Sequence, residues 1–320
     1  MTLVSTSARS QWPALEYAQW RDTATTLQLW MQIVGKTRLS RTPWLNHSWH
    51  VVLYVTARGL STSPFDVGGE LMEIEFDFID HALRIRTSQG QERALPLVGQ
   101  PVSAFYRSYL AAVSELGFTV RINPVPNEID PAIPFGDDNE HRIYDPEAAH
   151  RFWRVLIQAD RVFKLFRTAF LGKCSPVHFF WGSFDLAVTR FSGRRAPPHP
   201  GGVPSLPDTV VREAYSHEVS SAGFWPGNDT FPQAAFYSYA YPEPAGFREQ
   251  PVRPASATFN TVLGEFILPY DSLRAADSPD EALLSFLQST YEAAAETAHW
   301  DRPALECSLG VIGHPRPVPA

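Results

Sequence analysis

The chain has 320 residues, of which 44% are hydrophobic and 13% aromatic, so we expect an ordered globular protein with a large core. Its formal net charge of -7 argues against a general nucleic-acid binder, which needs a concentrated basic face. The sequence contains no run of about 20 apolar residues, which a membrane helix would need, and its first residues lack the pattern of a secretory signal. The two cysteines are far apart in the sequence, as expected for reduced thiols. We therefore expect a soluble cytoplasmic protein without a membrane partner.

Hydrophobic periodicity predicts the elements of the first half. Apolar residues at helical spacing predict a helix from Trp12 to Gly35. Alternating β-branched and aromatic residues predict strands over 49–56, 71–78, 83–87 and 118–122, with a helix over 101–116. In the second strand Glu73, Glu75 and Asp77 share one side, which we interpret as a solvated sheet face. Four prolines between Asn123 and Phe135 exclude a central strand or helix, so this stretch is interpreted as the connection between two halves.

The second half begins with the longest predicted helix. Asp145 is its predicted N-cap and Pro146 its first residue. Further strands are predicted over 177–181, 184–191, 214–222, 234–241 and 265–268, and Ser278 begins a last helix with a capping box. The proline-rich segment over 194–207 is too long for a turn, so it is interpreted as a lid, a binding loop or a surface spacer.

Together these elements predict an α+β fold, mainly antiparallel sheet with long amphipathic helices. Gly35-Lys36 and Gly172-Lys173 each end a predicted helix, and each is followed by an aromatic strand that contains Leu-x-Val-Thr. A duplication would account for this match, with an N-terminal half over 1–125 and a C-terminal half over 140–320 that share one core. Chance accounts equally well for so short a match.

The densest aromatic segment is predicted to form a hairpin at Gly182-Ser183, a dipeptide typical of a type II′ turn. The resulting register places Phe180 opposite Asp185 and His178 opposite Ala187 on one face. His178 and Asp185 would be diagonal neighbours, so the carboxylate could orient the imidazole as a general base. The alternatives are a purely structural His–Asp pair and one long strand bulged at Gly182, which would break this register.

Candidate functional residues gather in the segments NHSWH, SPVHFFWG and SHEVSSAGFWPG. Apolar walls with a few placed polar groups are typical of a small-molecule site. We therefore hypothesise a small-molecule-binding protein or a hydrolase-like enzyme. The catalytic candidates are His178, Asp185, His217 and Glu218, and the substrate-binding candidates are His50, Phe180, Trp181 and Trp225. The alternative is a non-catalytic interaction or structural protein; convergence of these side chains in one concave pocket would favour the first hypothesis.

Metal and thiol chemistry stay open at this point. His47, His50, His178 and His217 stand near predicted strand ends, but their spacing is not diagnostic, so neither a metal nor its identity is predicted. Cys174 beside a histidine would be a nucleophile only with a lowered pKa, and a buried inert thiol is the simpler interpretation. The sequence has no Gly-rich phosphate loop and no G-x-S-x-G elbow.

Long segments of the chain have a specific sequence: WPALEYAQWRDT, NHSWHVVLYVTARGL, FDFIDH, YDPEAAHRFWRVLIQADRVFK, GKCSPVHFFWGSFDLAVTRFSG, APPHPGGVP, EAYSHEVSSAGFWPG and SPDEALLSFLQSTYEAAA. In these segments the chain resembles an uncharacterised bacterial family of unknown function, over nearly its whole length. The resemblance implies a bacterial protein that forms a single unit. It implies no activity and no catalytic residues.

Overall fold

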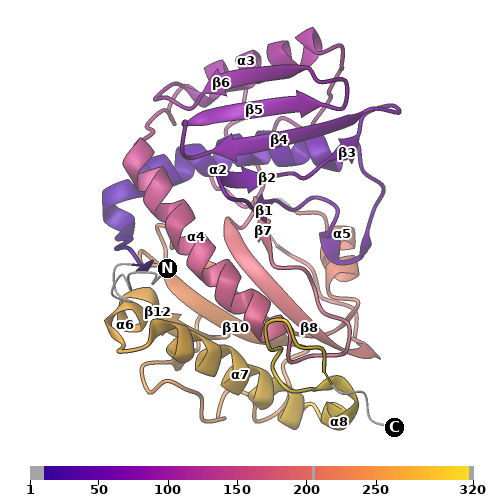
Figure 1. Cartoon of the computed structure of the whole chain (residues 1–320), viewed down its shortest axis with the longest axis vertical. Helices are drawn as coiled ribbons and strands as arrows, with labels where there is room; N and C mark the ends of the chain where they lie inside the picture. Colours follow the sequence, from indigo (N-terminus) through magenta and orange to yellow (C-terminus); the bar gives the residue numbers. More distant parts are fainter. Residues whose placement is uncertain (1–10, 204–205, 317–320) are drawn as a thin grey trace.

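The computed structural model describes residues 11–203 and 206–316. Two six-stranded antiparallel sheets, one from each half of the chain, lie one above the other in Figure 1. The helices of the described residues are α2 (Tyr17–Leu39), α3 (Val102–Glu115), α4 (Pro146–Arg167), α5 (Asp208–Ala214), α6 (Tyr270–Ala275), α7 (Pro279–Thr297) and α8 (Arg302–Leu305), with a 3-10 turn η1 (Asn46–Ser48). The α+β class predicted from the sequence is confirmed.

The first sheet has the strand order β1-β2-β4-β5-β6, and β3 also pairs with β4. Its strands are β1 (Tyr54–Val55), β2 (Gly59–Ser61), β3 (Phe65–Asp66), β4 (Leu71–Asp77), β5 (Ala82–Thr87) and β6 (Glu92–Pro96). Met72, Ile74 and Phe76 of β4 are fully buried, as the alternation of the strand predicts. Helix α2 passes behind this sheet in Figure 1.

The acidic side of β4 is a network of ion pairs, so the expectation of a solvated face is wrong for its buried carboxylates. The side chain of Asp77 is 0% exposed and lies 2.6 Å from Arg58 Nε and 3.1 Å from Arg84 Nε. Glu75 is also buried, 3.0 Å from Arg86. Two arginines of β5 and one that precedes β2 compensate the buried charges, as a desolvated carboxylate requires.

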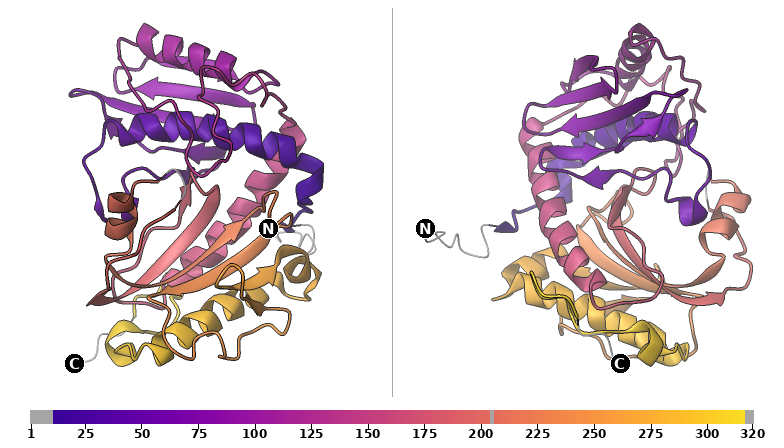
Figure 2. Two further views of the ribbon diagram at one scale, coloured as in Figure 1. Left: turned by 180° about the vertical axis from the view of Figure 1, so that it is seen from behind. Right: turned by 45° about the vertical axis from the view of Figure 1, so that its right-hand side comes forward.

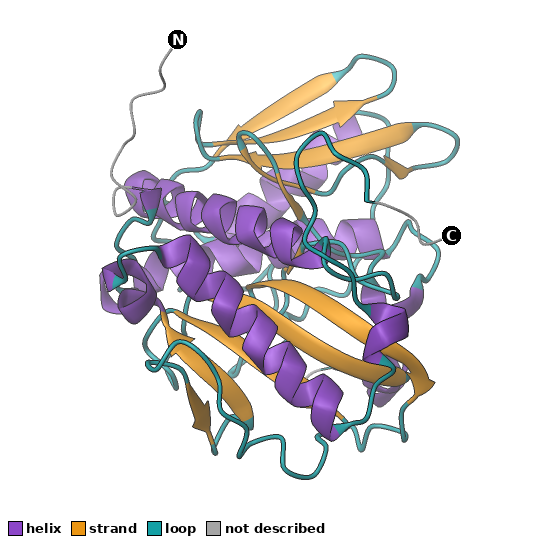
Figure 3. Cartoon of the chain, turned by 60° about the horizontal axis from the view of Figure 1, so that its bottom comes forward, coloured by secondary structure: helices purple, strands orange, loops and turns teal. Residues whose placement is uncertain are grey.

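The second sheet has the order β11-β12-β10-β9-β8-β7. Its strands are β7 (His178–Phe180), β8 (Asp185–Arg195), β9 (His217–Trp225), β10 (Ala235–Tyr241), β11 (Thr258–Asn260) and β12 (Glu265–Pro269). Helices α4 and α7 contact each other and the strands of this sheet, and Figure 3 shows α7 crossing them. The opposite face of the sheet is concave in Figure 2, with α5 at its rim.

The hairpin β7–β8 has the predicted register but a different turn. His178 pairs with Ala187 and Phe180 with Asp185. The loop consists of the four residues from Trp181 to Phe184. It is closed by a hydrogen bond from the amide of Phe184 to the carbonyl oxygen of Phe180 at 2.8 Å. Phe184, rather than Gly182, takes the left-handed conformation, with φ 62°. The type II′ turn is therefore wrong, and so is the bulged single strand.

Helix α2 extends four residues beyond its predicted end at Gly35 and begins later, at Tyr17. Gly35 lies inside the helix because the indole of Trp181 occupies the space that a side chain would take. The glycine is thus a packing site rather than a helix terminus. Helix α4 starts as predicted, with the side chain of Asp145 accepting from the amides of Glu147 and Ala148.

Other parts of the predictions also differ from the structure. In the segment 49–56, β1 takes up only two residues. The residues 118–122 form no strand, although Val120 and Ile122 pack against the core. The start of the predicted strand 214–222 belongs to α5, which ends at Ala214 before β9 begins. Ser278 precedes α7 but makes no side-chain capping bond.

The two halves share one hydrophobic core, which runs from Trp12 to Trp300. Trp20 of α2 packs on Phe152 of α4, with ring centroids 4.9 Å apart. A backbone bridge between Leu53 and Phe179 links the chain just before β1 to β7. Each half contains a helix, an antiparallel sheet and a further helix, and the duplication stays a prediction. Of the residues that the structure describes, no helix is both long and apolar enough to cross a bilayer.

Candidate functional site

The open face of the second sheet forms the floor of a cleft with a volume of about 1380 Å³. Residues of α2, η1, α5 and the connection 121–133 complete its walls. Both halves of the chain therefore contribute to it. A concave, largely apolar space with a few polar groups is typical of small-molecule sites.

Strand alternation brings a row of polar side chains to the cleft floor. Asp185 of β8, Tyr237 and Tyr239 of β10 and Glu265 of β12 all line the cleft. Leu186 and Val188 of β8 point to the other face of the sheet and are fully buried in the core. Since successive side chains of a strand point to opposite faces, the acids and tyrosines share one surface.

Asp185 is the most enclosed acid of the cleft, with 6% of its surface exposed. Ser183 Oγ donates to one of its carboxylate oxygens at 2.5 Å, and the hydroxyl of Tyr237 donates to the other. Burial raises the pKa of Asp185, and the hydrogen bonds from Ser183 and Tyr237 partly offset this effect. The same burial and the nearby carboxylate raise the pKa of Tyr237 well above its usual range.

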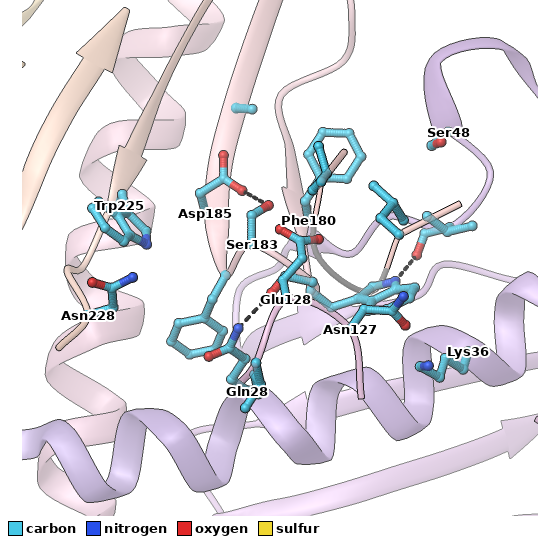
Figure 4. A pocket seen from close by; sticks show the side chains of 18 of the residues that line it. Gln28, Lys36, Ser48, Asn127, Glu128, Phe180, Ser183, Asp185, Trp225 and Asn228 are labelled. Carbon is cyan, nitrogen blue, oxygen red and sulfur yellow. Dashed lines mark hydrogen bonds between the residues drawn. The ribbon is translucent and has the colours of Figure 1, made fainter. Parts of the chain in front are cut away.

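Glu128 reaches into the cleft from the proline-rich connection. Its backbone is left-handed, with φ 58°, and its carboxylate lies over Gly182, where an added Cβ would fall on Oε1. Figure 4 shows Glu128 close to Ser183 and Phe180, with Asp185 just beyond. Within the described part of the chain, the carboxylate makes no hydrogen bond or ion pair.

The pKa of Glu128 is raised to about 7, first because the surrounding protein displaces bulk water and second because Asp185 is negative. The side chain is exposed and lines the cleft. The pKa of Glu265 is also raised to about 7, by burial and then by Asp185. Two carboxyl groups of the cleft therefore titrate near neutral pH.

Two tyrosine hydroxyls of the cleft are influenced by the charge of Glu265. Tyr215 and Tyr239 share a hydrogen bond of 2.9 Å, and the negative charge of Glu265 contributes to the raised pKa of each, after burial. Both phenols therefore stay protonated at neutral pH and can donate to a ligand.

His178 lies on the cleft face of β7, as predicted, and is 1% exposed. No hydrogen bond joins it to Asp185, whose oxygens are held by Ser183 and Tyr237. Both ring nitrogens lack a hydrogen-bond partner among the described residues. Burial, and then the positive charge of Arg167, lower the pKa of His178 to about 3, so the ring is neutral at physiological pH.

The three aromatic candidates, Phe180, Trp181 and Trp225, all line the cleft. Phe180 lies opposite Asp185 in the hairpin. The ring of Trp225 stacks on Phe231 at 5.7 Å. Trp181 is 7% exposed and serves mainly to anchor the hairpin. Its ring packs against Gly35 of α2, and its Nε1 donates to the carbonyl oxygen of Val51 at 2.7 Å.

The other three candidates lie outside the cleft lining. His50 is buried, and its Nδ1 accepts from the amide of Leu45 at 3.3 Å. His217 and Glu218 are consecutive in β9, so they point to opposite faces of the sheet. His217 is the first residue of β9, and its ring centroid lies 6.0 Å from that of His47. Glu218 is paired with Arg194 at 2.7 Å on the side of α7.

Metal and thiol sites receive no support from the described residues. The described residues contain no group of three or more histidine, cysteine, aspartate or glutamate side chains arranged to hold a metal ion. Cys174 and Cys307 are not joined to each other. Burial raises the pKa of the Cys174 thiol, which is the opposite of what a nucleophilic cysteine requires.

Sequence reasoning missed Glu128, Ser183, Tyr237, Tyr239 and Glu265. The tyrosines carried a usable signal, because the segment AFYSYAY repeats tyrosine at every second position and so predicts a tyrosine-lined face. Glu128 carried none, since it sits in an irregular connection.

No curated protein and no solved structure matches the chain. One family model does match, over residues 12–307, which is nearly the whole length. The chain therefore belongs to the family of unknown function DUF5996.

Proposed function

We propose that the protein binds a small organic molecule in the cleft and acts on it as a hydrolase-like acid–base enzyme. The observation that carries this proposal is the presence of two carboxyl groups with a pKa of about 7, Glu128 and Glu265, in one cleft with the buried Asp185. Near neutral pH such a group is protonated about half of the time, so it can both donate and accept a proton.

Glu128 is the proposed proton-exchanging group, because it is exposed to the cleft and free of hydrogen bonds among the described residues. For hydrolysis, a protonated carboxyl donates its proton to the leaving group while an ionised carboxylate accepts one from the attacking water. Glu128 and Glu265 can supply these two states at neutral pH. Asp185, fixed by Ser183 and Tyr237, is the positioning group.

His178, which the sequence suggested as the base, has a different role in this proposal. A group with a pKa of about 3 accepts a proton poorly at neutral pH. The neutral imidazole instead offers one donor and one acceptor to a ligand.

A thermal-shift screen of metabolites against the full chain tests the proposal, because a bound ligand raises the melting temperature by mass action. We expect at least one compound to stabilise the protein and to lose this effect in Thr189→Phe, which places a ring in the cleft. The exposed Glu249→Gln is the matched control for Glu128→Gln. Turnover of the hit, followed by NMR, should fall in Glu128→Gln and persist in Glu249→Gln.

The proposal fails if no compound stabilises the wild type, or if the hits bind Thr189→Phe equally well. Binding without turnover would support a ligand-binding protein and contradict the proposed enzymatic activity. We further propose a bacterial, cytoplasmic setting, which is supported by the family resemblance and by two thiols that form no disulfide with each other.

A further inference from the structure

We infer that the ligand is an organic cation that carries a primary ammonium group. The inference rests on the proposed function, because it names the ligand class of the same cleft. It comes from the arrangement of charge in the cleft and from one buried polar side chain that has no partner.

The acid cluster of the cleft, defined as Glu128, Asp185 and Glu265, lacks a counter-charge. No ion pair joins any of the three to a basic side chain anywhere in the residues described. Carboxylates in a low-dielectric site normally pair with a cation or become protonated. A ligand cation would supply the missing positive charge.

The basic side chains that line the cleft are committed elsewhere or lie on its exposed outer part. Lys36 Nζ donates to the carbonyl oxygen of Val125 at 2.6 Å. Arg21 pairs with Asp229 at 2.8 Å. Arg142 donates to the carbonyl oxygen of Asn139 at 2.6 Å, and Arg121 is exposed. The protein therefore does not neutralise the acid cluster by itself.

The second observation is independent of the acids. His178 is 1% exposed, lines the same cleft, and has two ring nitrogens without a partner in the described structure. Buried polar groups are nearly always hydrogen-bonded, so an unpartnered imidazole indicates a group that is supplied from outside the chain. Its neutral ring has a lone pair that can accept from an N–H.

Aromatic rings beside the acid cluster also favour a cationic ligand. Phe180 is opposite Asp185 in the hairpin, and Tyr237 and Tyr239 stack with ring centroids 6.1 Å apart on the same floor. Ring faces attract cations. Carboxylate oxygens beside the rings favour a primary ammonium group, which has three N–H donors, over a quaternary one, which has none.

Calorimetric titration with three probes of one shape tests this inference: 2-phenylethylamine, 2-phenylethanol and 3-phenylpropanoate. The amine should bind the wild-type chain about tenfold or more tightly than the alcohol, as expected for a hydrogen bond to a charged group, and the anion should bind weakest. Glu128→Gln should lose most of this preference, and Glu249→Gln should keep it.

The inference is overturned if the alcohol or the anion binds as tightly as the amine, or if Glu128→Gln keeps the preference for the amine. A neutral or anionic metabolite that stabilises the wild type but not Thr189→Phe would leave the proposed function standing while removing the ammonium ligand. If no probe and no metabolite binds, both proposals fail. Asp185→Asn, which keeps the shape of the carboxyl, provides a second variant should Glu128→Gln fold poorly.

Discussion

The indole of Trp181 lies directly against the backbone of Gly35, so the turn of the cleft hairpin is packed onto the C-terminal part of α2. Trp181 also donates to the carbonyl oxygen of Val51, which holds the ring in place. This contact ties one wall of the cleft, which is α2, to the strand that carries Asp185.

Gly35→Ala should lower the free energy of unfolding by about 1–3 kcal/mol, the usual cost of overpacking a core. The loss is expected even though alanine is favoured over glycine inside a helix by about 1 kcal/mol. Urea unfolding followed by circular dichroism measures it. A variant as stable as the wild type would show that the indole can move aside.

Gly182→Ala should leave the free energy of unfolding nearly unchanged, because its added Cβ meets only the end of the Glu128 side chain, which can shift. The carboxylate should then leave its position over the turn, so ligand binding in the cleft should weaken. Comparison with Gly35→Ala in the same urea and binding assays separates the two roles. Strong destabilisation of Gly182→Ala would contradict this assignment.

Asp77→Asn should destabilise the first sheet by about 2–4 kcal/mol at pH 7, because it breaks a buried charge pairing. Burial alone would raise the pKa of Asp77, but hydrogen bonds from Arg58, from the amides of Asp80 and Ile79, and from Arg84 lower it to about 2.

The folded pKa of Asp77 is below the ordinary value of 3.8, so its contribution is present above pH 3.8 and is lost as the pH falls toward about 2. The difference in melting temperature between Asp77→Asn and the wild type should therefore shrink in this window. The exposed Asp277→Asn serves as the control. A difference that stays constant down to the lowest measurable pH would refute the assignment.

Glu128 should have the opposite pH dependence. Its folded pKa of about 7 exceeds the ordinary 4.5, so the folded protein holds the proton more tightly and stability falls as the pH rises from about 4.5 to about 7. Glu128→Gln cannot ionise, so it should melt higher than the wild type above pH 7. Because the side chain is exposed, we expect a gain only of the order of 1 °C. Equal melting temperatures at high pH would argue that the carboxylate is fully solvated.

The sequence could predict which side chains share a face of the hairpin, but not its turn. A two-residue loop at Gly182 and a four-residue loop from Trp181 to Phe184 give the same pairing of Phe180 with Asp185. Alternation therefore predicts which side chains share a face, but not the length of the loop. Phe184 takes the left-handed backbone conformation, which the conformational preference of phenylalanine does not indicate.

The end of α2 illustrates a second limit. Glycine near the end of an apolar helical pattern usually marks a C-cap, and only the position of Trp181, far away in sequence, shows that Gly35 is an interior packing site. Glu128 was missed for a related reason. Periodicity reports regular elements, whereas the place of an irregular connection depends on the tertiary structure around it.

The connection from Asn123 to Phe135 joins the two halves of the protein and also carries Glu128 into the cleft. Surface connections usually tolerate a change in length, but here one residue more or less would withdraw a carboxyl group from the cavity. We therefore expect the length of this connection to be as tightly constrained as the position of the carboxyl group that it carries.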